Sequence, residues 1–336
     1  MILQGKVMLP VKIAGLGWYL PEQRITNEQL EKQLGFPSRW IERATGVQER
    51  RHATTETTLS MATHACHMAL DAAALDVGDI DVIICASSAP QQAIPCTAAL
   101  LQRSLHAPEG ASACFDLNAT CMGFLFALHT AAHLIAANVY RNVLICNSEL
   151  ASRSINYHER ESAVLFGDAA AAAVVTKSQS HEESGLWHAL FETYSSGADS
   201  AQIVGGGTLH HPNDPATVPE MNMFHMHGPA LFKQARQLLE PFLDRFFCKL
   251  DWERAQVDVV VPHQASRHGL ELLTRRLGFR HEQIIDDLAR RGNCVSASIP
   301  LALAEAVSNG RIQRGNRVLL IGTGAGLTLG ALALTF

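Results

Sequence analysis

The feature of this sequence that most constrains its fold is an internal repeat of about 175 residues. Two pairs of apolar segments echo each other along the chain: "DIDVIICASS" (79–88) with "QVDVVVPHQA" (256–265), and "RNVLICNSE" (141–149) with "NRVLLIGTG" (316–324). The aspartates Asp81 and Asp258 lie 177 positions apart, and the valines Val143 and Val318 lie 175 positions apart. Because solenoid repeats have periods of only about 20 to 50 residues, this spacing predicts two duplicated α/β halves.

Both halves share one order of predicted elements. Apolar β-branched runs alternate with Ala/Leu-rich segments, which is typical of an α/β protein with buried strands. Between the paired strands lie an Asn-containing turn and an apolar helix, "LNATCMGFLFALHTAAHL" in the first half and "RGNCVSASIPLALAEAV" in the second. The sequence predicts halves over residues 1–176 and 221–336, with a linker or excursion rich in Gly, Pro and charge over 177–220. Since ligand pockets favour interfaces between such units, we expect the site there.

The composition predicts a globular protein and argues against several classes of partner. With 336 residues, of which 47% are hydrophobic, the chain can bury a large core. Its formal net charge of -5 at pH 7 argues against nucleic acid and anionic membrane surfaces as partners, since both favour basic proteins. Gly5 and Pro10 interrupt the first apolar run, so the N-terminus does not resemble a secretory signal. No stretch reaches membrane-spanning length.

The cysteine and histidine patterns predict a reduced, cytoplasmic protein without a metal site. The eight cysteines include no C-x-x-C pair, and several lie in apolar segments. Histidine pairs occur, for example His225 and His227, but no cysteine lies beside them at the spacing of zinc ligands.

Cys121 is the first candidate for chemistry, because it stands where a predicted strand leads into the apolar helix of the first half. A helix N-terminus stabilises anions and can lower the pKa of a thiol, which raises the fraction of nucleophilic thiolate. Gly123 has no side chain that would crowd a substrate approaching the sulfur. The alternative is that Cys121 is a small core residue, as we expect for Cys85 and Cys146.

His263 and Asn293 lie in related loops of the second half. His263 follows the strand segment "VVVP", at the carboxyl end where the ligand sites of open sheets gather. Asn293 lies in the turn "RRGNCVSASIP" before a helix, near the position that Cys121 holds in the first half. Each residue has a structural alternative, His263 as a core histidine and Asn293 as a helix N-cap. Three such residues in topologically related loops favour a catalytic site.

Cysteine, histidine and asparagine in this order permit two chemistries. A papain-like protease also has its histidine and asparagine far downstream of the cysteine, but this sequence lacks a "CGSCW"-like stretch and any sign of secretion. The second chemistry is carbon–carbon bond formation on thioesters, in which the cysteine takes an acyl group and a second thioester loses CO2 to form an enolate. A histidine ring N–H and an asparagine amide N–H can stabilise the enolate oxygen without a permanent charge. This second chemistry gives each of the three residues a role.

The motifs around these residues resemble the thiolase superfamily, and most closely its β-ketoacyl-acyl-carrier-protein synthase III group. They are "DLNATCMGF" (116–124), "FGDAAAAAV" (166–174), "PHQAS" (262–266) and "GNCVSASIP" (292–300). The resemblance spans nearly the whole chain, from "GLGWYLPEQRITNEQLE" to "GTGAGLTLGALAL". It implies an α/β protein with the thiolase-like five-layer αβαβα fold, built from two duplicated halves.

The resemblance also implies roles for individual residues. Cys121 would be the acylated nucleophile, while His263 and Asn293 would bind the malonyl thioester carbonyl and stabilise the enolate. The backbone N–H groups of Cys121 and Ala325 would form the oxyanion hole.

The substrate-binding residues follow the family pattern less closely. Trp40 matches a tryptophan that stacks on the adenine of coenzyme A, and Arg160 matches an arginine on the other side of that nucleotide. Ile94 lies where acetyl-specific members place a bulky phenylalanine of the partner subunit at the base of the acyl pocket, so this pocket is expected to be longer. Polar or basic family residues are replaced at three positions: Ala44, Pro229 and His268.

Together these observations predict a cytoplasmic, homodimeric acyltransferase of the 3-oxoacyl-ACP synthase III type. It would condense an acyl-CoA primer with a malonyl thioester, malonyl-ACP, in fatty acid or related biosynthesis, with acyl carrier protein as a partner and no tightly bound cofactor. One alternative is head-to-head condensation of two acyl-CoAs, or acyl transfer to oxygen or nitrogen, in secondary metabolism. The other is a non-catalytic partner subunit, which the presence of Cys121 disfavours.

Overall fold

The computed structural model describes residues 8–160 and 162–336, and it is built around two mixed β-sheets. The first sheet has the strand order β1-β7-β6-β4-β5. In this sheet β7 runs antiparallel to both of its neighbours, whereas β6, β4 and β5 are parallel to one another. Its strands are β1 (Val11–Tyr19), β4 (Val82–Cys85), β5 (Ala113–Asp116), β6 (Asn142–Glu149) and β7 (Ala169–Lys177).

The second sheet repeats this arrangement. Its order β8-β13-β12-β11 reproduces the order and the relative strand directions of β7, β6 and β4, with β8 at the place of β1. Ile284 forms a parallel bridge to Val260 of β11, at the place that β5 takes in the first sheet. The strands are β8 (Gly185–Thr193), β11 (Val259–Pro262), β12 (Arg317–Gly324) and β13 (Thr328–Thr335). The prediction of two halves of similar build is therefore confirmed.

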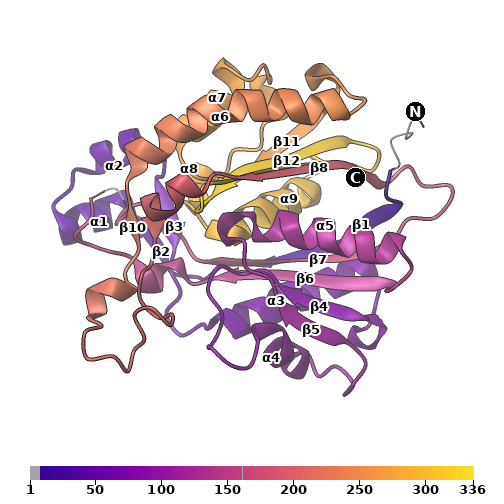
Figure 1. Cartoon of the computed structure of the whole chain (residues 1–336), viewed down its shortest axis with the longest axis horizontal. Helices are drawn as coiled ribbons and strands as arrows, with labels where there is room; N and C mark the ends of the chain where they lie inside the picture. The colour runs from indigo at the N-terminus through magenta and orange to yellow at the C-terminus, as the bar shows by residue number, and fades with distance from the viewer. Residues whose placement is uncertain (1–7, 161) are drawn as a thin grey trace.

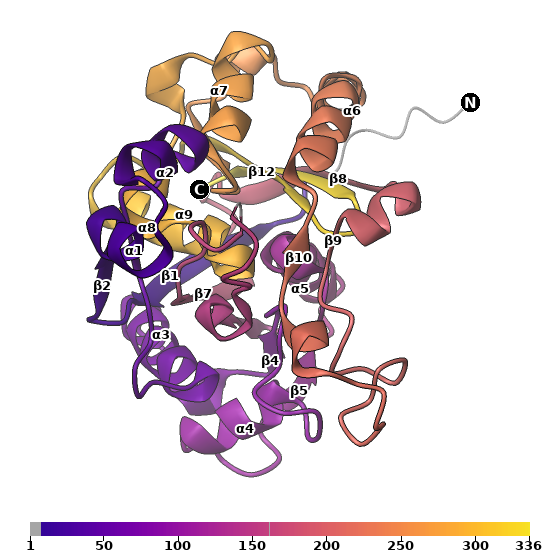
Figure 2. The ribbon, with the colours of Figure 1, turned by 90° about the vertical axis from the view of Figure 1, so that its left-hand side faces the viewer.

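Helices lie between the sheets and on both outer faces, which gives five layers (Figure 1). The central layer consists of α5 and α9, and each of these helices contacts both sheets. On the outside, α3 and α4 cover the first sheet, and α6 and α7 cover the second (Figure 2). The helices are α3 (Thr58–Ala73), α4 (Thr97–Ser104), α5 (Gly123–Ala136), α6 (Gly228–Lys249), α7 (Arg267–Arg275) and α9 (Ser298–Ser308).

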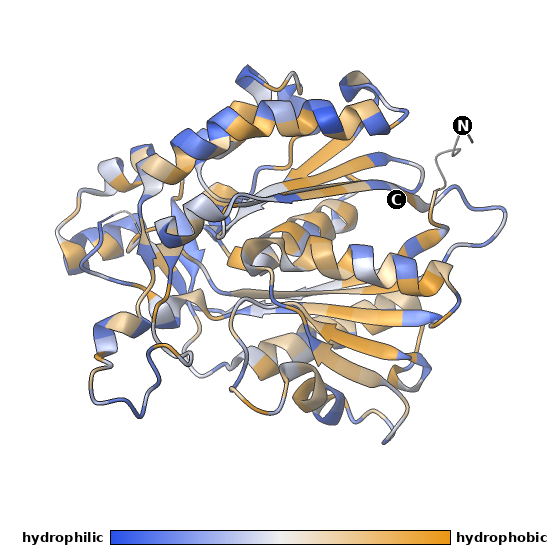
Figure 3. Cartoon of the chain, in the orientation of Figure 1, coloured by the Kyte–Doolittle hydropathy of each residue, from blue (hydrophilic) through white to orange (hydrophobic). Residues whose placement is uncertain are grey.

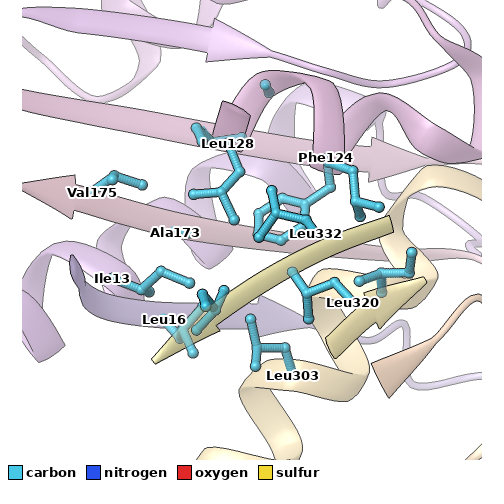
Figure 4. Close-up of a cluster of buried hydrophobic side chains, with 14 of the residues drawn as sticks. Ile13, Leu16, Phe124, Leu128, Ala173, Val175, Leu303, Leu320 and Leu332 are labelled. Atoms are coloured by element: carbon cyan, nitrogen blue, oxygen red, sulfur yellow. The ribbon is translucent and has the colours of Figure 1, made fainter. Parts of the chain in front are cut away.

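Strand side chains divide between the inner and outer cores, because successive residues of a strand point to opposite faces. In β4, Val82 and Ile84 belong to the core between the sheets, whereas Ile83 and Cys85 belong to the core under α3 and α4. Figure 3 shows that the strands are apolar over most of their length, as expected for strands buried on both faces. Figure 4 shows side chains of both halves that meet between the sheets, among them Leu16, Phe124, Leu128, Leu303, Leu320 and Leu332.

Strand β8 lies within residues 177–220, where the sequence predicts a linker or excursion. It pairs with β13 as an edge strand of the second sheet, so part of this segment belongs to the second half of the fold. The division of the chain at residues 177 and 221 stays a prediction. The remaining helices and strands outside the two large sheets are β2 (Arg24–Thr26), α1 (Asn27–Leu34), α2 (Ser38–Thr45), β3 (Glu49–Arg51), β9 (Ala201–Gln202), β10 (His225–Met226) and α8 (Leu288–Arg291).

Three properties of the described residues bear on the predicted class of protein. All eight cysteines lie in this part of the chain, and none forms a disulfide. Within residues 8–160 and 162–336, no helix is both long and apolar enough to cross a membrane. The same residues contain no group of three or more His, Cys, Asp or Glu side chains placed to hold a metal ion.

Candidate active site

A cavity of about 990 Å³ lies where the two halves meet, and the predicted catalytic residues line it. Cys121 enters from the first half, and His263 and Asn293 enter from the second. Ala325 and Trp40 line the same cavity. The structure therefore brings together three side chains that are separated by 142 and 30 positions in the sequence.

A strained turn presents Cys121 to the cavity. The Asn118 side-chain oxygen accepts a hydrogen bond from the Thr120 backbone N–H at 3.0 Å. Thr120 itself has φ 49°, a left-handed conformation that non-glycine residues adopt at a cost. The short 3-10 helix η2 (Thr120–Met122) then leads into α5. A Cβ at Gly123 would collide with the Ala86 carbonyl oxygen, so this position requires glycine because α5 packs closely on the end of β4, a reason different from substrate access.

The second half repeats this turn around Asn293, a residue with a predicted catalytic role. The Asn293 side-chain oxygen accepts from the Val295 backbone N–H at 2.9 Å, and Val295 has φ 50°. In the repeat of 175 residues, Asn293 therefore corresponds to Asn118, and Ser296 corresponds to Cys121. Because the turn uses the Asn293 oxygen, the Nδ2 hydrogens are left to donate to a ligand.

His263 is positioned by the end of β11. Its backbone N–H donates to the Ile321 carbonyl oxygen at 2.8 Å, and the residue is 6% exposed. Burial lowers the pKa of His263 to about 4. Because desolvation disfavours the charged form, the imidazole is neutral at physiological pH. A neutral imidazole can still donate one ring N–H to a developing negative charge.

The pKa of Cys121 shifts in the direction opposite to the one predicted from the helix N-terminus. Burial raises the pKa of this thiol to about 12, and the nearby carboxylate of Glu149 acts in the same direction. The backbone N–H groups of Cys121 and Ala325 lower the pKa, but by less than burial raises it. The resting sulfur is therefore a thiol, because desolvation of the anion outweighs the helix dipole here. The same two N–H groups are those that the family resemblance predicts for the oxyanion hole.

The predicted nucleotide-binding residues meet at the surface. Trp40 lines the cavity, and the Arg160 guanidinium lies over its ring at 3.8 Å from the ring centroid. The same guanidinium lies 5.2 Å from the centroid of the Phe36 ring. Arg160 and Trp40 are thus in contact, and a base can stack between them only after the guanidinium moves.

Ile94 does not line the cavity of its own chain. Its side chain is 84% exposed, and it lies in the loop between β4 and α4. Its predicted contribution to the acyl pocket of a partner subunit stays a prediction.

Two features of the cavity were missed from the sequence. Glu149, at the end of the apolar strand segment "NVLICNSE", lines the cavity and is 2% exposed. Gly269 lies inside α7, where a glycine weakens a helix, and it also lines the cavity. The sequence contained two signals for these residues. One was an acidic residue at the end of a buried strand, and the other was a glycine inside a predicted helix.

Replacing Gly269 with alanine should stabilise the protein. A Cβ at this position would meet Ser266 Oγ at 3.6 Å and no other atom within 4 Å. We expect the free energy of unfolding to rise by about 0.5–1 kcal/mol, since alanine favours the helix and restricts the unfolded chain. Thermal unfolding followed by circular dichroism measures this. A lower midpoint for Gly269→Ala would show that the cavity tolerates no added methyl group.

The alkylation of Cys121 by iodoacetamide should accelerate steadily with pH. With the pKa raised to about 12, the reactive thiolate fraction grows about tenfold per pH unit from pH 7 to 10 without a plateau. Mass spectrometry of the Cys121 peptide measures the rate, so the exposed thiol of Cys248 does not interfere. A plateau near pH 8 or 9 would contradict the raised pKa.

Comparison with known proteins agrees with the geometry of the cavity. Residues 115–195 match the family described as "3-Oxoacyl-[acyl-carrier-protein (ACP)] synthase III", and residues 248–336 match its C-terminal family. The chain is 37% identical over 327 residues to the beta-ketoacyl-[acyl-carrier-protein] synthase III of Symbiobacterium thermophilum, which covers 97% of this chain and 98% of that relative. The chain belongs to the β-ketoacyl-[acyl-carrier-protein] synthase III family.

Solved structures of synthase III proteins have the same fold. The 3-oxoacyl-[acyl-carrier-protein] synthase III of Aquifex aeolicus matches with a TM-score of 0.88 at 35% identity, over 97% of this chain and 100% of that chain. The Pseudomonas aeruginosa synthase III matches with a TM-score of 0.87 at 30% identity, over 97% and 98%. The thiolase-like fold and the synthase III acyltransferase family, both predicted from the motifs, are confirmed. The roles of individual cavity residues stay predictions.

Proposed function

We propose that this protein condenses an acyl-CoA primer with malonyl-ACP and releases CO2, through an acyl-Cys121 intermediate, in fatty acid or related biosynthesis. The observation that carries the proposal is that Cys121, His263 and Asn293, from two different halves, line one cavity. Membership of the synthase III family supports the reaction class.

The first half-reaction transfers the acyl group to the protein. The Cys121 sulfur attacks the thioester carbonyl carbon, and the bond between that carbon and the coenzyme A sulfur breaks. The thiol proton leaves with coenzyme A, so no proton needs to be stored. The N–H groups of Cys121 and Ala325, which lower the pKa of the resting sulfur, then stabilise the oxyanion.

The second half-reaction forms the carbon–carbon bond. The malonyl thioester loses CO2, and the electron pair of the broken bond forms an enolate. The neutral His263 ring and the Asn293 amide donate hydrogen bonds to the enolate oxygen. The enolate carbon then attacks the acyl carbonyl and releases the Cys121 sulfur as a thiolate, which takes up a proton because its pKa is about 12.

The partners follow from the same reaction. We propose acyl-CoA and acyl carrier protein as partners. Trp40, which lines the cavity, and Arg160, which lies over the Trp40 ring, would be the contacts for the nucleotide. We also propose a cytoplasmic homodimer, in which Ile94 of each subunit reaches the acyl pocket of the other. Its 84% exposure leaves this side chain available for such a contact.

Incubation with acyl-CoA and radiolabelled malonyl-ACP tests the proposal. We expect an acyl adduct on Cys121 and stoichiometric CO2 release with the β-ketoacyl-ACP product. An adduct without CO2 release, but with turnover when a second acyl-CoA, an alcohol or an amine is added, would instead support the head-to-head or acyl-transfer alternative. No adduct with any primer would favour the non-catalytic subunit.

Primers of medium or greater length should outcompete acetyl-CoA. Isoleucine at position 94 is smaller than the phenylalanine of acetyl-specific members, so we expect the acyl pocket to be longer. Each buried methylene contributes about 0.8 kcal/mol, close to fourfold in kcat/KM. A competition series of acyl-CoAs from about two to sixteen carbons measures this preference. Equal or faster turnover with acetyl-CoA would contradict it, and Ile94→Phe should shift the preference toward acetyl-CoA.

A further inference from the structure

The carboxyl group of Glu149 lies at the end of β6, where the two halves of the protein meet. It is 2% exposed and lines the cavity with Cys121. Its oxygens accept hydrogen bonds from the Ser88 backbone N–H at 2.7 Å and from the Ser88 hydroxyl at 2.6 Å. The hydroxyl of Ser296, in the other half, also donates to it. Among the described residues, no lysine or arginine forms an ion pair with Glu149, so these donors are its partners.

From Ser88, hydrogen bonds continue to the turn that carries the nucleophile. The Ser88 carbonyl oxygen accepts from Asn118 Nδ2 at 3.0 Å. Asn118 Oδ1 in turn accepts from the backbone N–H of Thr120 at 3.0 Å, directly before Cys121. One side of the Glu149 carboxyl group is therefore connected to the strained Thr120–Cys121 turn.

On its other side, the carboxyl group is connected to the turn that carries Asn293. Ser296 follows Val295, whose backbone N–H donates to Asn293 Oδ1 at 2.9 Å. Asn293 and Ser296 lie in the same turn (293–296), so the hydrogen bond from the Ser296 hydroxyl connects this turn to Glu149. A single carboxyl group is thus bonded directly to the Asn293 turn and connected through Ser88 and Asn118 to the Cys121 turn.

The repeat gives the second half no equivalent of Glu149. The residue 175 positions later is Gly324. A Cβ at Gly324 would lie 2.8 Å from Thr120 Oγ1 and 3.5 Å from the backbone nitrogen of Cys121. The nucleophile turn therefore fills the space of a second side chain, and the two halves share one carboxyl group.

We propose that Glu149 is a positioning residue that holds the Cys121 turn and the Asn293 turn at a fixed separation. This inference rests on the proposed function. A negative charge at Glu149 would also disfavour a thiolate at Cys121, in the same direction as burial, which is the larger cause of the raised pKa of this thiol. Burial raises the pKa of the Glu149 carboxyl group as well. The titratable side chains lining the cavity among the described residues are Cys121, Glu149, His263 and His268.

Glutamine at position 149 separates the hydrogen bonds of this side chain from its charge. Oε1 accepts from the Ser88 N–H and from the Ser296 hydroxyl, and a glutamine oxygen can do the same. In the wild type the Ser88 hydroxyl donates to Oε2; in the variant the glutamine NH2 group can instead donate to the Ser88 hydroxyl oxygen. Glu149→Gln therefore keeps the connections and removes the charge, whereas Glu149→Ala removes both.

The two half-reactions are measured separately on the full-length protein. Acyl transfer is followed as the rate of adduct formation on Cys121 with acyl-CoA, and decarboxylation as CO2 release from malonyl-ACP in the absence of primer. We compare Glu149→Gln, Glu149→Ala, Ser88→Ala and Ser296→Ala with the wild type. The matched control is Ser152→Ala, because the Ser152 hydroxyl donates at 2.6 Å to the buried Asp168 carboxylate, and neither residue lines the cavity.

We expect Glu149→Ala to slow both half-reactions by at least about tenfold, as a displaced reacting group can cost up to about a hundredfold. Ser88→Ala should slow acyl transfer more than decarboxylation, and Ser296→Ala should do the reverse. Glu149→Gln should keep both rates within about threefold and make Cys121 alkylation faster at each pH, because the charge that disfavours the thiolate is removed. Ser152→Ala should leave the ratio of the two rates and the alkylation profile unchanged.

Equal losses in both half-reactions for Ser88→Ala and Ser296→Ala would overturn the positioning role, as would the same loss in Ser152→Ala. A loss in Glu149→Gln as large as that in Glu149→Ala would also overturn it, because the glutamine variant keeps the hydrogen bonds. If Glu149→Ala does not fold, as judged by circular dichroism, the serine and glutamine variants still test the proposal. Absence of an adduct in the wild type would count against the proposed function instead. The pH profile of Cys121 alkylation would still test the effect of the Glu149 charge on the sulfur.

Discussion

Replacing Cys121 with alanine should lower the rate of condensation by on the order of 10⁴-fold or more and remove the acyl adduct, because a covalent pathway loses its nucleophile. No other cysteine lines the cavity among the described residues, so no second thiol can take its place. Decarboxylation of malonyl-ACP by Cys121→Ala should continue, since His263 and Asn293 remain.

Mass spectrometry of the intact protein after incubation with acyl-CoA measures this result. Cys248→Ala is the control, since Cys248 is the exposed cysteine, and it should keep both the adduct and the activity. An adduct that persists in Cys121→Ala but disappears in Cys248→Ala would mean that the surface thiol, not the cavity thiol, was acylated.

Replacing His263 or Asn293 with alanine should have the opposite effect: decarboxylation should be impaired, while acyl transfer to Cys121 should continue. Each variant removes one hydrogen-bond donor to the enolate oxygen, and loss of one such donor costs about a hundredfold to a thousandfold. We therefore expect decarboxylation and condensation to fall by that factor in His263→Ala and in Asn293→Ala. The acyl adduct on Cys121 should still form, because acyl transfer uses the backbone N–H groups of Cys121 and Ala325.

Separate assays of adduct formation and CO2 release distinguish the two steps. His281→Ala, at an exposed histidine of the same half, is the control and should keep both rates. The pH dependence adds a second test, because the pKa of His263 is lowered to about 4. Decarboxylation should not fall as the pH decreases from 8 to about 5, since the imidazole stays neutral over this range. A decline with a midpoint near pH 6.5 would show that His263 titrates as an exposed histidine does.

The sequence predicts the fold well because the repeated segments form the most buried strands of both halves. Val82 and Ile84 in one half, and Val259 and Val261 in the other, face the same core, so both halves keep the same apolar runs. Strand β8 was harder to predict, since it lies in a segment whose glycines, prolines and charges indicate a loop. Its pairing with β13 depends on a partner more than a hundred residues away.

Three motifs were enough to predict that Cys121, His263 and Asn293 share one cavity, but the electrostatics of the cavity could not be predicted. A helix N-terminus is visible in the sequence, whereas the amount of protein that surrounds the Cys121 sulfur is a property of the packed structure. The role of Glu149 was hidden for the same reason, because Ser88 and Ser296 reach it from segments that are far apart in the chain.

The central layer of helices also limits how this protein can move during turnover. Many enzymes that divide their reacting groups between two lobes close on the substrate by a hinge. Here α5 and α9 contact both sheets, so opening such a hinge would expose Phe124, Leu303 and Leu320 to water. Exposure of apolar surface costs a free energy of about 25 cal/mol per Å². We therefore expect substrates to enter and leave without a hinge motion between the two sheets.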